Sequence, residues 1–241
     1  MTFAEWKPIL LAWAQSDNGC RNRLAHARAL VAGAMSRAGR PFVSLSGGKD
    51  STVVTHLVLA QCPDVMVMHW DYGRFYIPRW LKAEIERNAA AIGVRNLRVE
   101  TSPEYERLGR TAVNVLGREC IHKLLPQLRR EGYDLGFTGI RAQESLKRRR
   151  NYPTPFYSMG GMRTCAPLLD WTWQDVWAYT FSNNLPYASI YERYAAAEGL
   201  ENARFSTFFD NEFAFLGRAN IDGVLMWRDR HRHGEPNGQT S

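Results

Sequence analysis

The stretch Ser44-Leu45-Ser46-Gly47-Gly48-Lys49-Asp50-Ser51 decides the fold class of this 241-residue chain. A short apolar run from Pro41 to Leu45 leads into it, and a helical pattern from Lys49 to Leu59 follows it. Two glycines let the backbone turn sharply and approach an anion closely, and the free amides at a helix start point towards that anion. The segment therefore predicts a strand, an anion-binding turn and a helix, in that order.

The polar residues of this turn suit a phosphate or a sulfate. Ser46 and Ser51 can donate hydroxyl hydrogen bonds, and Lys49 adds a positive charge. Asp50 would repel a bare phosphate, so we expect it either to hold the loop together or to bind Mg²⁺. The spacing differs from Gly-x-x-x-x-Gly-Lys-[Ser/Thr] and from Gly-x-Gly-x-x-Gly. An ordinary strand-to-helix turn is the alternative, but the complete hexapeptide behind an apolar strand favours anion binding.

The rest of the chain alternates between apolar strands and helical patterns. We predict strands at 41–45, 65–70, 97–100 and 135–138, and helices at 49–59, 78–91 and 111–131. Such alternation is typical of an α/β fold with a mainly parallel sheet. Ligands bind such sheets at the carboxyl ends of the strands, which here carry glycine and charge at 46–51, 71–73 and 139–144.

The flanking segments are organised differently. Residues 1–38 predict an N-terminal helical segment, interrupted at 17–19, and residues 39–195 form the predicted α/β domain that carries the anion-binding turn. Within that domain we expect a loop over 148–163 and a helix over 171–181 with Thr172 as its N-cap. Residues 196–241 are weakly patterned and predict an irregular C-terminal extension with a mobile tail.

Composition restricts the class of protein. Hydrophobic residues make up 45% of the chain, which argues against a disordered protein, and no apolar run is long enough to span a membrane. The first residues lack the basic region of a signal peptide, so we expect a cytoplasmic protein. The four cysteines are far apart in sequence, so we expect neither a zinc site nor an iron–sulfur cluster.

The chain is basic, with 31 lysines and arginines against 24 acidic residues and a net charge of +7. Only five of the basic residues are lysines. Either a polyanionic ligand or a general bias towards arginine explains this excess. Arg141 and the run Lys147–Arg150 lie within ten residues of each other, which favours an anion site at Arg141 and Arg148; a solvated basic turn is the alternative for the others.

Three segments resemble the phosphoadenosine-phosphosulfate (PAPS) reductase family of the PP-loop, or adenine nucleotide α-hydrolase-like, superfamily. Ser46–Ser51 is similar to the PP-loop, Gly139–Ser145 to Gly-x-Arg-x-x-Glu-Ser, and Pro167–Tyr179 to Pro-Leu-x-x-Trp-x-x-x-Asp-Val-Trp-x-Tyr. The resemblance covers about residues 25–195. It implies a Rossmann-like, doubly wound, mainly parallel sheet with helices on both faces.

The resemblance also implies a binding site for the anionic end of an adenine nucleotide, either ATP or the sulfonucleotides PAPS and APS. With the basic residues above, the expected nucleotide-binding residues are Ser44, Ser46, Gly47, Gly48, Lys49, Asp50, Ser51, Asp71, Gly73, Gly139, Arg141, Arg148 and Arg163. Among them Lys49, Asp50 and Arg141 are the expected catalytic residues, and Asp50 is the expected ligand of Mg²⁺. Tyr72 stands where family members carry the threonine of Asp-Thr-Gly.

One feature of the family's reductases is missing from this sequence. They carry a reactive cysteine in a Glu-Cys-Gly segment near the C-terminus, whereas residues 166–241 contain no cysteine. We therefore favour an enzyme that cleaves ATP between the α and β phosphates and adenylylates an acceptor in sulfur transfer or nucleic-acid modification. A reductase that uses Cys120 or Cys165 and a non-catalytic nucleotide- or nucleic-acid-binding module are the alternatives. Expected partners are the nucleotide, a nucleic acid or an acceptor protein, and a second copy of the chain.

Overall fold

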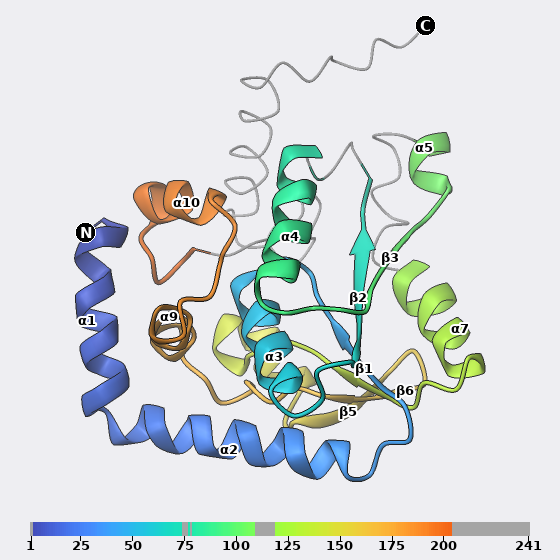
Figure 1. The fold of residues 1–241 in the computed structure, drawn as a ribbon, viewed down its shortest axis with the longest axis horizontal. Helices are drawn as coiled ribbons and strands as arrows, with labels where there is room; N and C mark the ends of the chain where they lie inside the picture. The colour runs from blue at the N-terminus through green and yellow to red at the C-terminus, as the bar shows by residue number, and fades with distance from the viewer. Residues whose placement is uncertain (1, 74–76, 78, 109–118, 204–241) are drawn as a thin grey trace, which may run out of the picture.

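In the computed structural model, which describes residues 2–73, 77, 79–108 and 119–203, strands and helices alternate along most of the chain (Figure 1). In chain order the elements are α1 (Phe3–Ser16), α2 (Asn18–Met35), β1 (Pro41–Ser44), α3 (Lys49–Leu59), β2 (Met66–Asp71), α4 (Arg79–Ala91), β3 (Leu97–Thr101), α5 (Glu104–Leu108), the π-helical turn η2 (Cys120–Leu124), α7 (Leu125–Arg130), β4 (Leu135–Phe137), the 3₁₀ turn η3 (Ala142–Glu144), α8 (Leu146–Asn151), β5 (Phe156–Met159), β6 (Met162–Cys165), α9 (Trp173–Ser182) and α10 (Ile190–Glu198).

The six strands form one sheet in the order β3-β2-β1-β4-β6-β5. All neighbouring pairs are parallel except β5 and β6. The chain fills one half of the sheet from β1 outwards to β3 and then crosses to β4 on the other side of β1. The strand order therefore reverses between β1 and β4, and a crevice for ligands lies at the carboxyl ends of strands on either side of such a reversal.

Helices cover both faces of the sheet, as predicted. On one face, α2, α3 and α9 bury a cluster that includes Val31, Val54 and Val176 against Val43 of β1. On the other face, α7 and α5 pack against the alternate side chains of the central strands, with Leu128 and Tyr105 beside Phe42 and Trp70. Alternation of side chains along the pleated strands produces these two cores. The α/β, Rossmann-like fold class predicted from the sequence is confirmed.

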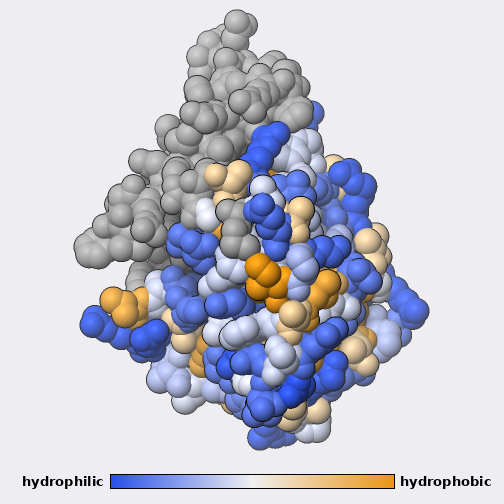
Figure 2. Space-filling model, turned by 90° about the vertical axis from the view of Figure 1, so that its left-hand side faces the viewer, coloured by the Kyte–Doolittle hydropathy of each residue, from blue (hydrophilic) through white to orange (hydrophobic). Residues whose placement is uncertain are grey.

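The N-terminal helices are anchored by one buried carboxylate. Asp175 in the first turn of α9 is 1% exposed and accepts hydrogen bonds from Arg23 of α2 at 2.7 Å and from Trp13 of α1 at 3.3 Å. Its carboxylate also accepts from the backbone amide of Thr172, the predicted N-cap of α9. Figure 2 shows the side of the molecule that carries α1, where the surface is mostly hydrophilic around a small apolar patch.

Two parts of the sequence-based prediction were wrong, and two others lie partly outside the described residues. The segment 148–163 is not a loop throughout, because it contains most of α8, all of β5 and the start of β6. Gly160 and Gly161, with φ of +57° and +76°, form the two-residue turn of the β5–β6 hairpin. Helix α10 was missed. Of the helix predicted over 111–131, only residues from 119 onwards are described, and a π-helical turn there precedes Pro126. The C-terminal extension beyond residue 203 also lies outside the described residues.

Candidate functional site

The reversal of strand order brings the two main sequence motifs together. The Ser46–Ser51 loop follows β1, and Gly139–Arg141 follows the neighbouring strand β4. The approach is so close that a Cβ on Gly139 would lie 2.7 Å from the carbonyl carbon of Asp50 and 2.7 Å from the amide nitrogen of Ser51. Both distances are well inside van der Waals contact, so only glycine lets β4 end against the first turn of α3.

The Ser46–Ser51 loop is stabilised by its own hydroxyl groups. The Ser51 hydroxyl donates to the Gly48 carbonyl at 2.8 Å and accepts from the Ser46 amide at 3.2 Å, while the Ser46 hydroxyl accepts from the Gly48 amide at 3.3 Å. Gly47 has φ of +84°, and a Cβ there would lie 2.5 Å from the Ile85 side chain of α4. The glycine is therefore required both by the backbone conformation and by the packing of α4.

The three expected catalytic residues form one buried charged cluster at the start of α3. One carboxylate oxygen of Asp50 accepts a hydrogen bond from Lys49 Nζ at 3.0 Å, and the other accepts from Arg141 Nε. Lys49 and Arg141 are 2% and 3% exposed. Burial lowers the pKa of Lys49. Burial alone would raise the pKa of Asp50, but the Arg141 and Lys49 cations outweigh it and hold that pKa well below its ordinary value.

This pairing bears on the expected magnesium site. Both oxygens of the Asp50 carboxylate already accept hydrogen bonds from cations. In this arrangement Asp50 fixes the two cations beside the loop, and its role as a ligand of Mg²⁺ stays a prediction. Within the described ranges, no group of three or more histidine, cysteine, aspartate and glutamate side chains is placed to hold a metal ion.

Asp50 of this cluster lines a cavity of about 340 Å³ at the end of the sheet, whereas the buried side chains of Lys49 and Arg141 are not part of its lining. Its lining joins the loop after β1, the end of β2, the start of the segment after β4, the hairpin and α10: Ser44, Leu45, Ser46, Gly48, Asp50, Ser51, Met68, Trp70, Tyr72, Cys120, Thr138, Gly139, Ile140, Glu144, Arg148, Met159 and Tyr191. One side of this cavity is polar and charged, and the other is aromatic and sulfur-containing. It can hold an anionic group on the first side and a flat apolar group on the second.

The basic segment after β4 contributes Arg148 to this cavity. Its guanidinium pairs with the Glu144 carboxylate, which also accepts from the Arg141 backbone amide at 3.3 Å. Glu144 thus orders the loop. Arg149 and Arg150 of the same short helix are exposed.

Asp71 and Gly73 lie at the end of β2 and form a turn. The Asp71 carboxylate accepts from the Gly73 amide at 2.8 Å and lies 3.9 Å from Lys82 Nζ of α4. Between them, Tyr72 lines the cavity where the family pattern has a threonine.

The structure places Arg163 away from this cavity. Arg163 pairs in β6 with Leu135 at the start of β4, and its guanidinium lies 2.9 Å from the Asp134 carboxylate. Asp134 also accepts from the amides of Gly39 and Arg40, just before β1. Arg163 therefore stabilises the opposite end of the sheet, where its side chain is 60% exposed.

The two candidate nucleophilic thiols differ in position. Cys120 of η2 lines the cavity, and burial raises its pKa to about 12. Cys165 of β6 is fully buried in the core beside α2 and α3, and burial raises its pKa to about 12 as well. Both thiols are therefore protonated near neutral pH, and only Cys120 of these two is placed to meet a ligand in the cavity.

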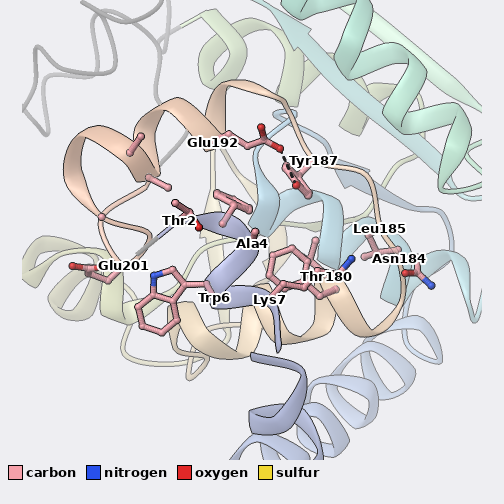
Figure 3. Close-up of a pocket in the computed structure, with 15 residues that line it drawn as sticks. Thr2, Ala4, Trp6, Lys7, Thr180, Asn184, Leu185, Tyr187, Glu192 and Glu201 are labelled. Carbon is pink, nitrogen blue, oxygen red and sulfur yellow. Dashed lines mark hydrogen bonds between the residues drawn. The ribbon is translucent and has the colours of Figure 1, made fainter. Parts of the chain in front are cut away.

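A larger hollow of about 1100 Å³ lies between α1, α9 and α10 (Figure 3). Its walls are largely aromatic and aliphatic, with Phe3, Trp6 and Phe181 among them, and the Tyr187 hydroxyl donates to Glu192 at 3.2 Å. The expected site residues instead gather at the smaller cavity, where charged groups and the helix start converge. We therefore take the smaller cavity as the candidate site.

Sequence reasoning missed the aromatic part of the site. Trp70 of β2 and Tyr191 of α10 line the cavity, although no spacing in the sequence singled them out. Tyr191 in particular belongs to a helix that was not predicted. No signal that we can identify in the sequence would have found it.

Three comparisons relate this geometry to known proteins. The model of the phosphoadenosine phosphosulfate reductase domain family matches residues 40–199. A phosphoadenosine 5'-phosphosulfate reductase of Xanthomonas axonopodis pv. citri is 31% identical over 161 residues, which are 63% of this chain and 66% of the relative. A reductase of the same name from Xylella fastidiosa is 29% identical over 169 residues, covering 64% of this chain and 68% of the relative. The chain thus matches about two thirds of the length of these relatives.

A solved structure has a similar fold. The crystal structure of a phosphoadenylyl-sulfate (PAPS) reductase from Candida auris, in a phosphate complex, aligns with a TM-score of 0.52 and 17% identity. The alignment covers 68% of this chain and 82% of that chain. At this identity the likeness shows the fold alone. Among the described residues, no helix is both long and apolar enough to cross a membrane.

Proposed function

The chain belongs to the phosphoadenosine phosphosulfate reductase family, and from that premise we propose that it is an enzyme that binds ATP in the 340 Å³ cavity and cleaves it between the α and β phosphates. One observation carries the proposal. Asp50 holds Lys49 and Arg141 together, at the start of a helix and beside a glycine turn. This cluster concentrates positive charge where an anionic group would lie against backbone amides.

The proposed reaction needs positioning and charge stabilisation rather than a proton acceptor. A nucleophilic atom of the acceptor forms a bond to the α phosphorus, and the bond from that phosphorus to the bridging oxygen breaks. The electron pair leaves with pyrophosphate, whose added negative charge is stabilised by Lys49, Arg141 and the loop amides other than those of Ser46, Gly48 and Lys49, which already donate within the protein. Asp50 keeps both cations in place without binding the leaving group.

The sequence of the C-terminal part supports adenylyl transfer over reduction. Residues 166–241 contain no cysteine, whereas the family's reductases keep their reactive cysteine near the C-terminus. The acceptor is a sulfur carrier, a nucleic acid or a protein, and the basic side chains of Arg149 and Arg150 suit the last two if they are anionic.

A second candidate function is sulfonucleotide reduction, which the position of Cys120 and the names of the relatives favour. The Cys120 thiolate would attack the sulfur of PAPS or APS and form an S-sulfocysteine. The sulfur–oxygen bond to the nucleotide phosphate would break, with the electron pair leaving on the nucleotide. An external dithiol would then release sulfite and become oxidised to a disulfide. The raised pKa of Cys120 opposes this route, because the thiolate is the nucleophile.

Thermal-shift titration with ATP, AMP, APS and PAPS, followed by product assays, tests these functions. A ligand that binds only the native state raises the melting temperature. We expect ATP to stabilise the protein, and pyrophosphate to be released when ATP, Mg²⁺ and an acceptor are present. Sulfite released from PAPS with a dithiol would instead establish the reductase, and nucleotide binding without either product would indicate a binding module. The adenylyl-transfer proposal fails if ATP produces no shift.

A matched pair of variants ties the result to the site. Arg141→Lys keeps a positive charge but loses the Nε contact with Asp50, and is expected to weaken ATP binding by about tenfold or more. Arg149→Lys makes the same exchange at an exposed position outside the cavity lining and is expected to leave binding unchanged. Equal effects of the two variants would mean that ATP binds elsewhere.

A further inference from the structure

Helix α10 reaches the start of α3 through one aromatic residue. Tyr191 is 0% exposed, lines the cavity and lies edge-on to Trp177 of α9 at 5.3 Å between ring centroids. Its hydroxyl accepts a hydrogen bond from the backbone amide of Lys49 at 3.0 Å. Its ring lies 5.5 Å from Lys49 Nζ. A single side chain thus contacts Lys49 at both its backbone and its ammonium group.

Each of these contacts has a separate physical consequence. The Lys49 amide is the first of the donors that a helix start leaves without an intrahelical partner, and the Tyr191 hydroxyl satisfies it. This fixes the backbone of α3 where the charged cluster begins. The aromatic face attracts the ammonium and favours its charged form. The other charged groups that act on this ammonium are Asp50, Arg141 and Glu144.

We propose that Tyr191 is a positioning residue for the nucleotide site: its hydroxyl orients the first turn of α3, and its ring holds the Lys49 ammonium beside the cavity. This inference rests on the proposed function, because it assumes that Lys49 interacts with an anionic ligand there. It assigns α10 a part in ligand binding, in addition to that of the Ser46–Ser51 loop.

Removal of the hydroxyl tests the first contact. Tyr191→Phe keeps the ring, and we expect the dissociation constant for ATP to rise about tenfold, which corresponds to the loss of one hydrogen bond that holds the site. Tyr179→Phe is the matched control. This variant also removes the hydroxyl of a buried tyrosine, which hydrogen-bonds His56 Nδ1 at 2.8 Å. Tyr179 does not line the cavity, so we expect ATP affinity to stay unchanged.

Removal of the ring tests the second contact through pH. In wild-type protein, we expect ATP binding to weaken at alkaline pH as Lys49 loses its proton. Tyr191→Leu removes the attraction that favours the ammonium, so we expect this weakening to begin at lower pH than in wild type. In Tyr191→Phe the pH at which binding weakens is expected to stay near that of wild type, because the ring remains. A purely structural role for Tyr191 would lower the melting temperature without moving this pH.

The outcomes separate this inference from the proposed function. If wild-type protein binds ATP and Tyr191→Phe binds it equally well, Tyr191 does not position the site, whatever Tyr191→Leu does. Equal weakening by Tyr179→Phe would attribute the effect to general destabilisation and overturn the inference too. If the wild type itself binds no adenine nucleotide, the proposed function fails first.

Discussion

Replacement of Gly139 by alanine tests the contact on which the whole site depends. The added methyl group would lie 2.7 Å from the Asp50 carbonyl carbon, 2.7 Å from the Ser51 amide nitrogen and 3.0 Å from the Asp50 carbonyl oxygen. All three atoms belong to the backbone of the first turn of α3, so no side chain can rotate away. Since carbon atoms pack at roughly 3.5–4 Å, either β4 or α3 must move by about 0.8 Å or more.

The expected magnitude follows from that displacement. Overpacking of a buried site by one methyl group costs about 1–3 kcal/mol of unfolding free energy. Arg141 lies two residues after the mutated position and pairs with Asp50, so the same movement alters the geometry of the charged cluster. A misplacement of about 1 Å at a catalytic group lowers the rate by about a hundredfold. Urea unfolding measures the first effect, and ATP titration with pyrophosphate release measures the second.

Gly33→Ala provides the control. That glycine lies in α2, where a Cβ would be 3.5 Å from the flexible end of Arg37, and alanine favours a helix more than glycine does. We expect this variant to be as stable as wild type or up to about 1 kcal/mol more stable, with unchanged ATP affinity. If Gly139→Ala retains both wild-type stability and wild-type affinity, the close approach of β4 to α3 is not what builds the site.

Three further predictions concern other parts of the molecule. Asp175→Asn is expected to lower the unfolding free energy at pH 7 by about 1–3 kcal/mol, because the hydrogen bonds of Arg23 to a buried carboxylate are lost while its weaker contact with Asp17 at 3.7 Å remains. Since the pKa of Asp175 is lowered in the fold, the wild type loses this contribution as the pH falls below about 4, and unfolding curves that differ equally at pH 7 and pH 3 would contradict the assignment. Cys120 is expected to react slowly with iodoacetamide at pH 7.5, and more slowly with ATP bound, as measured by peptide mass spectrometry; fast labelling would instead favour the reductase function. Arg163→Ala is expected to leave ATP affinity within twofold of wild type and to lower the unfolding free energy by less than about 1 kcal/mol, because its ion pair with Asp134 is largely exposed. A large loss of ATP affinity would place Arg163 in the site.

The parallel core could be predicted from the sequence because its signals are local. Apolar runs of strand length alternate with helical patterns, and the observed strands β1 to β4 begin and end within a residue or so of the predicted ranges. Thr172 likewise caps α9 as its position before Asp175 predicts. The β5–β6 hairpin was missed because prolines and two glycines within 148–163 are also typical of loops. A Gly-Gly pair between two four-residue runs is the signal of a tight hairpin turn that identifies it in retrospect.

The site could be predicted only in part. The Ser46–Ser51 loop and Gly139–Arg141 are continuous motifs, and the structure brings them together at the point where the strand order reverses. Arg163 had been grouped with them, but its place in β6 beside the start of β4 depends on a strand pairing that was not predicted. The position of Tyr191 at the site depends on how α10 packs against α3 and α9. Such a tertiary contact produces no periodic pattern in a single sequence.

The charges around the cavity distinguish an anion site from a general excess of arginine. Among the described residues, Lys49, Arg141 and Arg148 face two carboxylates, Asp50 and Glu144, so in their ordinary ionised states one positive charge is in excess. At the opposite end of the sheet, Arg163 and Asp134 form a simple exposed pair. An unbalanced charge destabilises the folded protein far more when it is buried than when it faces water. A bound anion would offset that cost at the cavity, whereas a neutral ligand of equal size would not, so the excess charge supports the proposed binding of an anionic ligand.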